Sequence, residues 1–445
     1  MTRSSATGTT AADATAGGRA IAVRGNRVGR DVVPLRGSDF SRDIATQGSA
    51  GVSAEPGLPG SRAIRGHAAR SRLHFPPAWR GDAGLLDWDS STLACAMTPI
   101  PARAEARRQF VSSMLGSAVR GIEPASADAS FRSYWRVTLA DGSTRVLMDA
   151  PPEREDSRPW LDIGARLRRA ALHVPRVDHV DLAQGFILME DLGTRSYLTQ
   201  LDAGSADALY ADALDALLRM QTHVDTNGLA RFDRDFVIGE LELMPEWFLR
   251  RHLGHEPTCA QWDALEAAST HLVEAILAQP QTFMHRDYHS RNLMVVAPGS
   301  TTGDGIHPNP GIIDFQGALV GPVTYDLASL LRDCYIEWDA ERIEGWLESH
   351  RQRLLDAHQL DEHVDAARLR RWFDLTGLQR HLKVLGIFCR LHYRDGKMQY
   401  LADLPLVWRY VLDIARRYRE LAPLADLLEA ARAGRDLTAP RTDTG

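Results

Sequence analysis

Two short motifs near the middle of the chain carry residue types that can transfer a phosphoryl group. Residues 285–292 read His-Arg-Asp-Tyr-His-Ser-Arg-Asn, and residues 311–317 read Gly-Ile-Ile-Asp-Phe-Gln-Gly. The carboxylate of Asp287 can orient a substrate hydroxyl and accept its proton, while Asn292 can bind the metal that holds the nucleotide phosphates. Asp314 would supply a second metal ligand, since Mg²⁺ prefers hard oxygen atoms. The two motifs therefore indicate phosphoryl transfer from a nucleotide.

The alternative is that the first motif is an incidental turn and that Asp314 is an ordinary carboxylate at a strand end. However, apolar residues 293–296 follow the first motif directly, and a second apolar strand, Gly311 to Ile313, leads to Asp314. A motif match counts only in such a structural context. We therefore interpret both motifs as functional and call residues 285–292 the catalytic loop.

Size and charge narrow the class of protein. The chain has 445 residues, a net charge of -6 and a pI near 6.2, so two or three domains are possible and nucleic acid is not expected as a partner. No apolar run approaches the ~20 residues of a membrane span, and the amino terminus lacks the apolar segment of a secretory signal. The cysteines lack metal-ligand spacing and fit reduced thiols: Cys95, Cys259, Cys334 and Cys389. We expect a cytoplasmic, monomeric enzyme without membrane contact.

Arginine supplies nearly all of the positive charge, because Lys383 and Lys397 are the only lysines. A Walker A loop, which requires a lysine after its glycines, is therefore excluded. The strand lysine that usually pairs with nucleotide phosphates in kinase-like folds is absent as well, since no lysine precedes the catalytic loop.

Composition divides the chain into four parts. Residues 1–96 are rich in Gly, Ala, Ser, Thr and Arg, and we interpret them as a disordered extension or as sequence upstream of a true start at Met97. We expect a nucleotide-binding lobe in residues 97–192, a catalytic and substrate lobe in residues 193–435, and a disordered tail in residues 436–445. The predicted fold class is α+β, with a small antiparallel sheet lobe and a larger, mainly helical lobe.

Hydrophobic periodicity predicts the elements of each lobe. In the first lobe it indicates strands at 133–139, 144–148, 176–180 and 185–190 and helices at 103–115 and 159–172. In the second lobe it indicates helices at 206–223, 241–252, 260–277, 325–331, 340–357, 366–388 and 406–428. Residues 301–310, rich in Gly and Pro, are expected to form a surface loop.

These features together resemble the aminoglycoside phosphotransferase family within the protein-kinase-like fold, over residues 102–430. Within that family the sequence is most similar to the anomeric kinases that phosphorylate N-acetylmuramate and N-acetylglucosamine at the C1 hydroxyl. The narrower match rests on further motifs in the same order, at residues 148–153, 186–193, 244–249, 314–317, 321–326, 378–386 and 393–397.

The resemblance implies a role for each motif residue. Asp287 would be the catalytic base, and Asn292 and Asp314 would bind Mg²⁺. Glu190 and Asp191 would belong to the hinge that meets the adenine of ATP through backbone groups. Two residues would support the catalytic loop: His285 and Asp326. A cap for the helix that begins at Tyr325 is an equally good interpretation of Asp326.

The sequence departs from the kinase pattern at two places. The segment 125–134, which corresponds to the nucleotide loop, has no Gly-x-Gly, and the expected strand lysine falls on or near Met148. An arginine must then neutralise the nucleotide phosphates, and Arg132 is the first candidate, ahead of Arg136 and Arg154. A pseudokinase is the alternative, but a degraded site is not expected to retain the catalytic and metal residues together.

The charge of the second lobe bears on the substrate. The segment 379–397 is strongly basic, which disfavours cationic aminoglycosides and favours a neutral or anionic sugar. Arg380 and Lys383 lie three residues apart and can hold the lactyl carboxylate of N-acetylmuramate from one helix face. Three further residues are substrate-binding candidates: Trp247, His289 and Tyr393. The alternatives are that the charged residues only solvate a long helix and that the aromatic residues Trp247 and Tyr393 belong to the core, as aromatic residues at helical spacing more often do.

The leading hypothesis is an ATP-dependent and Mg²⁺-dependent sugar 1-kinase that feeds peptidoglycan recycling. A kinase of another small hydroxyl compound, such as an aminoglycoside, a choline-like alcohol or another sugar, is the second hypothesis. A protein kinase or a regulatory nucleotide-binding module is the third. Gly317 passes almost directly into the motif at residues 321–326, so there is little room for the activation segment of a protein kinase.

Overall fold

The computed structural model describes residues 100–441, apart from residues 128–131, 297–300, 303–304 and 307. All of them belong to the compact unit Ser71–Gly445. The predicted disordered extension, residues 1–96, and the alternative start at Met97 lie outside the described residues.

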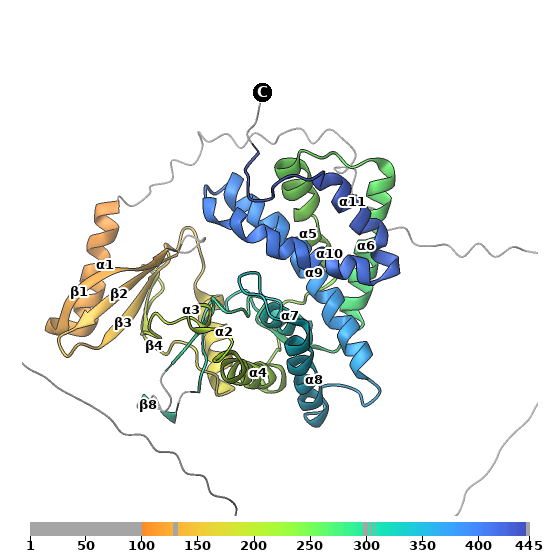
Figure 1. The fold of residues 1–445 in the computed structure, drawn as a ribbon. Helices are drawn as coiled ribbons and strands as arrows, with labels where there is room; N and C mark the ends of the chain where they lie inside the picture. Colours follow the sequence, from red (N-terminus) through yellow and green to blue (C-terminus); the bar gives the residue numbers. More distant parts are fainter. Residues whose placement is uncertain (1–99, 128–131, 297–300, 303–304, 307, 442–445) are drawn as a thin grey trace, which may run out of the picture. The chain divides into compact units, whose positions relative to one another are not determined.

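The first lobe is built on a five-stranded antiparallel sheet (Figure 1). The strand order is β1-β2-β3-β5-β4, and the bounds are β1 Val119–Ala127, β2 Ser133–Leu139, β3 Thr144–Asp149, β4 Val177–Asp181 and β5 Phe186–Glu190. Successive side chains of a strand point to opposite faces. On β3, Leu147 therefore packs with Phe110 of helix α1 (Ile100–Leu115), whereas Met148 packs with Trp160 of helix α2 (Arg158–Arg169).

Four of these strands and both helices were predicted, and β1 was not. Strand β1 contains Gly121 and Pro124, two residue types that are unfavourable in a strand. It can accommodate them because it is the edge strand of the sheet and because its pairing with β2 is irregular next to both residues. The sequence signal for a strand was therefore weak here.

The second lobe is mainly helical, as predicted (Figure 1). Its helices are α3 Tyr197–Gln200, α4 Ala206–His223, α5 Arg234–Leu241, the π-helix η3 Met244–Leu253, α6 Cys259–Leu277, α7 Tyr325–Leu331, α8 Ala340–Asp356, α9 Ala366–Tyr393, α10 Leu404–Arg417 and α11 Ala422–Arg432. Short 3₁₀ helices lie at Met398–Asp403 and Arg419–Leu421 in this lobe and at Gly116–Ala118 in the first lobe. Helix α5 was not predicted. The single helix predicted at 406–428 is wrong, because the chain is extended at Tyr418 (φ -109°, ψ 119°) and Pro423 lies in the first turn of α11.

Short strand pairs hold the two motifs. Strand β6 (Gln281–Met284) pairs with β11 (Leu319–Pro322), and β7 (Leu293–Met294) pairs with β10 (Gly311–Ile312). The segment predicted as a surface loop, residues 301–310, also contains the two-residue strands β8 (Thr301–Thr302) and β9 (Gly305–Ile306).

Helix α9 is the centre of the second lobe and packs against α6, α7, α10 and η3. Every residue from Trp372 to Gly386 is buried, charged residues included. Because the helix is covered on all sides, its charged side chains must find partners inside the protein. The central position of α9 therefore determines which contacts are made by its basic residues that were predicted to bind the substrate.

The carboxyl end is more ordered than predicted. Within the predicted tail, Leu437 is 2% exposed and belongs to the core of the second lobe. Its carbonyl lies 3.0 Å from His252 Nε2, and the Arg441 amide donates to Tyr393 Oη at 2.8 Å. The ordered lobe therefore extends beyond residue 435 to at least residue 441. In the described chain, no helix combines the length and the apolar character that crossing a membrane requires.

Candidate active site

The side chain of Asp326 holds the start of the catalytic loop in place. This carboxylate is 2% exposed and accepts the backbone amides of His285 at 2.6 Å and Arg286 at 2.9 Å. Burial raises the pKa of Asp326 to about 7, and the two amides act in the opposite direction. Arg286 has a left-handed backbone (φ 81°), which an arginine adopts only where its surroundings enforce it. Asp326 therefore holds the bend that presents Asp287.

The predicted loop support His285 is completely buried, and its Nε2 lies 3.2 Å from the carbonyl of Ile313. Burial lowers the pKa of His285 to about 4, so the ring is neutral at pH 7. This contact joins the catalytic loop to the second motif. Asp326 thus holds this bend through two backbone amides, and His285, which belongs to the bend, contacts the carbonyl of Ile313.

A second carboxylate, Asp333, also supports the loop and was not recognised in the sequence. Its two oxygens accept the backbone amides of Ser290 at 2.9 Å and Tyr335 at 3.1 Å. Asp333 is completely buried. It lies seven residues after Asp326 and belongs to no motif, so nothing in the sequence distinguished it from a surface acid.

The two motifs converge on a pair of oxygen donors. Asn292 Nδ2 donates to the Asp287 carbonyl at 2.9 Å and lies 3.4 Å from Asp314 Oδ2, so Asn292 Oδ1 is the atom left for a metal. Gln316 Nε2 donates to Asp314 Oδ1 at 2.7 Å, and the buried Gln316 Oε1 has no hydrogen-bond partner. Asp314 itself has φ 63°.

This donor set fits Mg²⁺. One amide oxygen, one carboxylate oxygen and an orphaned buried amide oxygen are hard ligands, and Mg²⁺ usually takes few protein ligands together with phosphate oxygens and water. Within the described residues, no group of three or more His, Cys, Asp or Glu side chains forms a complete metal cage. The site therefore suits a metal that arrives with the nucleotide.

Asp287 is ionised. Burial opposes its ionisation, but the electrostatic effects of Lys383, then of His289 and Arg286, together outweigh it and hold the pKa of Asp287 below its usual value. A carboxylate that is already charged can accept a hydrogen bond from a substrate hydroxyl and later its proton. The surroundings of Asp287 thus match the role predicted for it.

Lys383 acts behind the catalytic loop, contrary to the prediction that it faces substrate. Its Nζ lies 2.7 Å from Glu240 Oε1, and the same oxygen lies 2.8 Å from Arg286. Gln379 donates to Glu240 Oε2 at 3.1 Å, and Lys383 donates to Tyr325 Oη at 3.2 Å. We call this set of five residues, Glu240 with Arg286, Tyr325, Gln379 and Lys383, the Glu240 network. Helix α9 is enclosed, so Lys383 is directed to an internal acid rather than to a ligand.

The other substrate residues predicted in this region are also withdrawn from solvent. Arg380 is 4% exposed and donates to Cys334 Sγ at 3.2 Å. The Tyr393 hydroxyl contacts His252 Nδ1 at 2.9 Å and the amide of Arg441, so it anchors the carboxyl end of the chain. The internal contacts of Arg380 and Tyr393 do not support the prediction that these two residues bind the sugar.

Trp247 and His289 have different surroundings. Trp247 packs on the core of the second lobe and lines a surface cavity with Trp262 and Arg250, apart from the motif residues. His289 lies in the catalytic loop with its ring 5.5 Å from the ring of Tyr335, and its buried Nδ1 has no partner. His289 thus belongs to the catalytic loop, two residues after Asp287.

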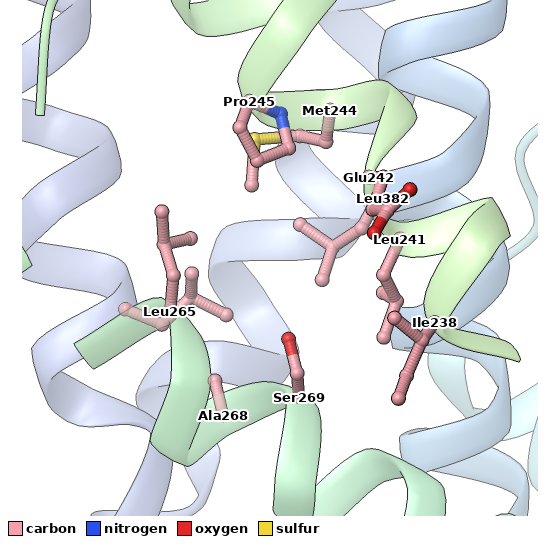
Figure 2. Close-up of a pocket in the computed structure, with 10 residues that line it drawn as sticks. Ile238, Leu241, Glu242, Met244, Pro245, Leu265, Ala268, Ser269 and Leu382 are labelled. Atoms are coloured by element: carbon pink, nitrogen blue, oxygen red, sulfur yellow. The ribbon is translucent and has the colours of Figure 1, made fainter. Parts of the chain in front are cut away.

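A cavity of about 530 Å³ joins the two lobes and is large enough for a nucleotide. Four predicted residues line it: Glu190, Asp191, Asn292 and Asp314. Sequence reasoning missed its apolar and aromatic wall, which suits a flat base: Tyr134, Val146, Trp160, Pro175, Met189, Leu192, Met294, Ile313 and Phe315. By contrast, the apolar pocket in Figure 2, between α5, α6 and α9, has only about 20 Å³, the space of a single water.

The arginine that faces this cavity from the first lobe is Arg136, not Arg132. Arg132 is 7% exposed, forms an ion pair with Glu155 at 3.0 Å and does not line the cavity; neither does Arg154. Arg136 lines the cavity and donates to both carboxylate oxygens of Asp191, through Nε at 2.6 Å and through Nη2 at 3.1 Å. Arg136 projects from the middle of β2, whereas Arg132 comes directly before the first residue of that strand.

Comparisons with known proteins agree with this geometry. A family model described as "Phosphotransferase enzyme family" matches residues 121–363. A curated protein from Pseudomonas putida named "N-acetylmuramate/N-acetylglucosamine kinase" is 43% identical over 310 residues, which cover 70% of this chain and 88% of that protein. A protein of the same name from Neisseria meningitidis is 40% identical over 313 residues, with coverages of 68% and 88%.

The fold has counterparts among solved structures. A choline/ethanolamine kinase family protein from Mesorhizobium loti is similar with a TM-score of 0.50 at 14% identity, and the match covers 75% of this chain and 100% of that chain. At this level of identity the similarity concerns the fold alone. It confirms the predicted two-lobed, protein-kinase-like fold.

Proposed function

The chain belongs to the phosphotransferase enzyme family, and we propose that it transfers the γ-phosphoryl group of ATP to the C1 hydroxyl of N-acetylmuramate and N-acetylglucosamine. The observation that carries this proposal is the name of two relatives at 43% and 40% identity, each matched over 88% of its length. The ionised Asp287 beside the donor pair Asn292 and Asp314 supports it from the chemistry of the site.

In the proposed reaction, ATP lies in the cavity between the lobes with its base against the apolar wall and the backbone of Glu190 and Asp191. Asn292 and Asp314 would hold Mg²⁺, which neutralises phosphate charge when it is bound. Asp287 orients the C1 hydroxyl for in-line attack on the γ-phosphorus and accepts its proton as the new oxygen–phosphorus bond forms and the bond to ADP breaks. An anomeric hydroxyl is more acidic than other sugar hydroxyls, which eases this transfer.

The residues around the cavity bear on how the phosphates of ATP would be neutralised without a strand lysine. Met148 is completely buried in the core, so its strand position contributes no charge. Arg136 lines the cavity with its guanidinium tied to Asp191. Mg²⁺ and loop groups would then carry most of the neutralisation of the triphosphate. We further propose that the enzyme works as a cytoplasmic monomer that returns cell-wall amino sugars to metabolism.

The test is to incubate the full chain with ATP, Mg²⁺ and one of four acceptors: N-acetylmuramate, N-acetylglucosamine, glucose or kanamycin. Phosphorus NMR of the product identifies the phosphorylated position. We expect a C1 phosphate on both N-acetylated sugars. Phosphorylation of kanamycin alone, or of none of the four compounds, would overturn the proposed function.

A further inference from the structure

The cavity between the lobes contains one more cation, Arg291, for which the mechanism has no use. Arg291 precedes the metal ligand Asn292 and lines the cavity with it. The other arginine in the cavity wall, Arg136, is held by Asp191 in a two-pronged ion pair. Of the two arginines that line this cavity, Arg291 is therefore the one whose N–H groups are available to bind a ligand.

The contacts of Arg291 leave its hydrogen-bonding edge open. Its guanidinium lies 3.5 Å above the centre of the Tyr335 ring, and its side chain is 40% exposed. The nearest acidic group among the described residues is Asp403, at 3.8 Å from Arg291 Nη2, which is longer than a hydrogen bond. A guanidinium that stacks on an aromatic face still presents its N–H groups in its own plane, as a fork that matches a carboxylate.

The stack is built into the fold. Asp333 accepts the amide of Ser290, the residue before Arg291, and also the amide of Tyr335, the residue beneath its guanidinium. The Tyr335 ring packs against Phe388, with ring centres 6.2 Å apart. One buried carboxylate thus fixes both members of the stack, so Arg291 loses little freedom when it binds a ligand.

We propose that Arg291 binds the carboxylate of N-acetylmuramate and thereby determines the preference for the acidic sugar over N-acetylglucosamine. The inference rests on the proposed function. Arg291 and Asp287 lie in one rigid loop, so a sugar whose C1 hydroxyl meets Asp287 directs its substituents along the same loop. Arg291 takes the role that the sequence suggested for Arg380 and Lys383, whose side chains are internal. The Asp403 carboxylate holds the guanidinium loosely and gives way to the ligand.

The experiment compares the two sugars in the full chain. For Arg291→Gln we expect the ratio of kcat/KM for N-acetylmuramate to that for N-acetylglucosamine to fall about 10- to 100-fold, mainly through the KM of N-acetylmuramate, the size of one charge-assisted bidentate contact. Arg291→Lys, which keeps the charge but loses the fork, is expected to lose less. Tyr335→Leu, which removes the platform, is expected to lower the same ratio by a smaller factor.

A matched control is Arg409→Gln, which removes an exposed arginine paired with Glu337 and should leave the ratio unchanged. An equal loss with both sugars, accompanied by a higher KM for ATP, would assign Arg291 to the nucleotide phosphates and overturn the inference. A wild-type chain that phosphorylates neither sugar would instead overturn the proposed function itself. Thermal unfolding of each variant separates a local effect from loss of the fold.

Discussion

The charge of Glu240 should stabilise the second lobe by several kcal/mol, because two cations depend on it. The Glu240 side chain is 6% exposed, Lys383 is 7% exposed and Arg286 is 28% exposed. Substituting Glu240→Gln keeps the shape but leaves both cations facing a neutral amide. Removing one partner of a buried ion pair costs about 3–5 kcal/mol, and we expect the free energy of unfolding at pH 7 to fall by that amount.

The pH dependence of this loss distinguishes a charge effect from a packing effect. Burial already lowers the pKa of Lys383, while Glu240 acts to raise it. Without Glu240, Lys383 should release its proton at a lower pH, after which no unpaired charge remains on it. The destabilisation by Glu240→Gln should therefore shrink between pH 7 and pH 9, and the double variant Glu240→Gln, Lys383→Met should recover part of the loss.

Urea unfolding followed by circular dichroism, at pH 7 and at pH 9, measures both effects. The matched control is Glu246→Gln, whose exposed ion pair with Arg250 should contribute about 0.5 kcal/mol or less. A loss below about 1 kcal/mol for Glu240→Gln, or an equal loss at both pH values, would refute the reasoning that buried charge controls this region.

Three further predictions concern the site and its stability. Asp287→Asn and Asp314→Ala should each lower kcat by at least about 100-fold, with circular dichroism spectra like that of the wild type; wild-type turnover in either would contradict the assigned roles. Gln316→Leu should raise the Mg²⁺ concentration for half-maximal activity, whereas an unchanged titration would remove Gln316 from the metal site. His285 and His350 are buried, and burial lowers the pKa of each to about 4, so the unfolded chain binds protons more readily between pH 6.5 and pH 4. The free energy of unfolding should be fully retained above pH 6.5 and fall by about 2 kcal/mol per histidine at pH 5; a flat profile would contradict this.

That Asn292 and Asp314 lie close together was predictable, because their geometry is local. Asn292 comes directly before β7, and Asp314 is the second residue after β10. The antiparallel register pairs Leu293 with Ile312, and the amide of Ile313 donates to the Asn292 carbonyl at 3.1 Å. One short strand pair therefore brings the two side chains together, and motif spacing alone determines that arrangement.

The surroundings of the residues predicted to bind the sugar could not be predicted, because they depend on distant parts of the chain. A basic segment of a long helix looks like a solvated or ligand-binding face when only sequence is considered. Lys383 is internal because Glu240, far earlier in the chain, lies across from it on α5. Periodicity cannot locate such a partner, and it cannot reveal that α9 is covered on every side. Periodicity could not show either that Trp247 lines a separate surface cavity with Trp262 and Arg250.

Two cations next to the catalytic loop, Lys383 and Arg291, therefore have different roles. Lys383 lies behind the loop, where it forms an ion pair with Glu240 and also favours the ionised form of Asp287. Arg291 lies at the cavity, where no carboxylate of the described chain reaches it within hydrogen-bond distance. A cation needed only for orientation can be buried and paired, whereas a cation that binds an anion must keep its donors accessible. Lys383, which favours the ionised form of Asp287, is buried and paired, whereas Arg291, which is proposed to select the substrate, is exposed. This difference in pairing and exposure, rather than residue type or position in the sequence, distinguishes the two cations.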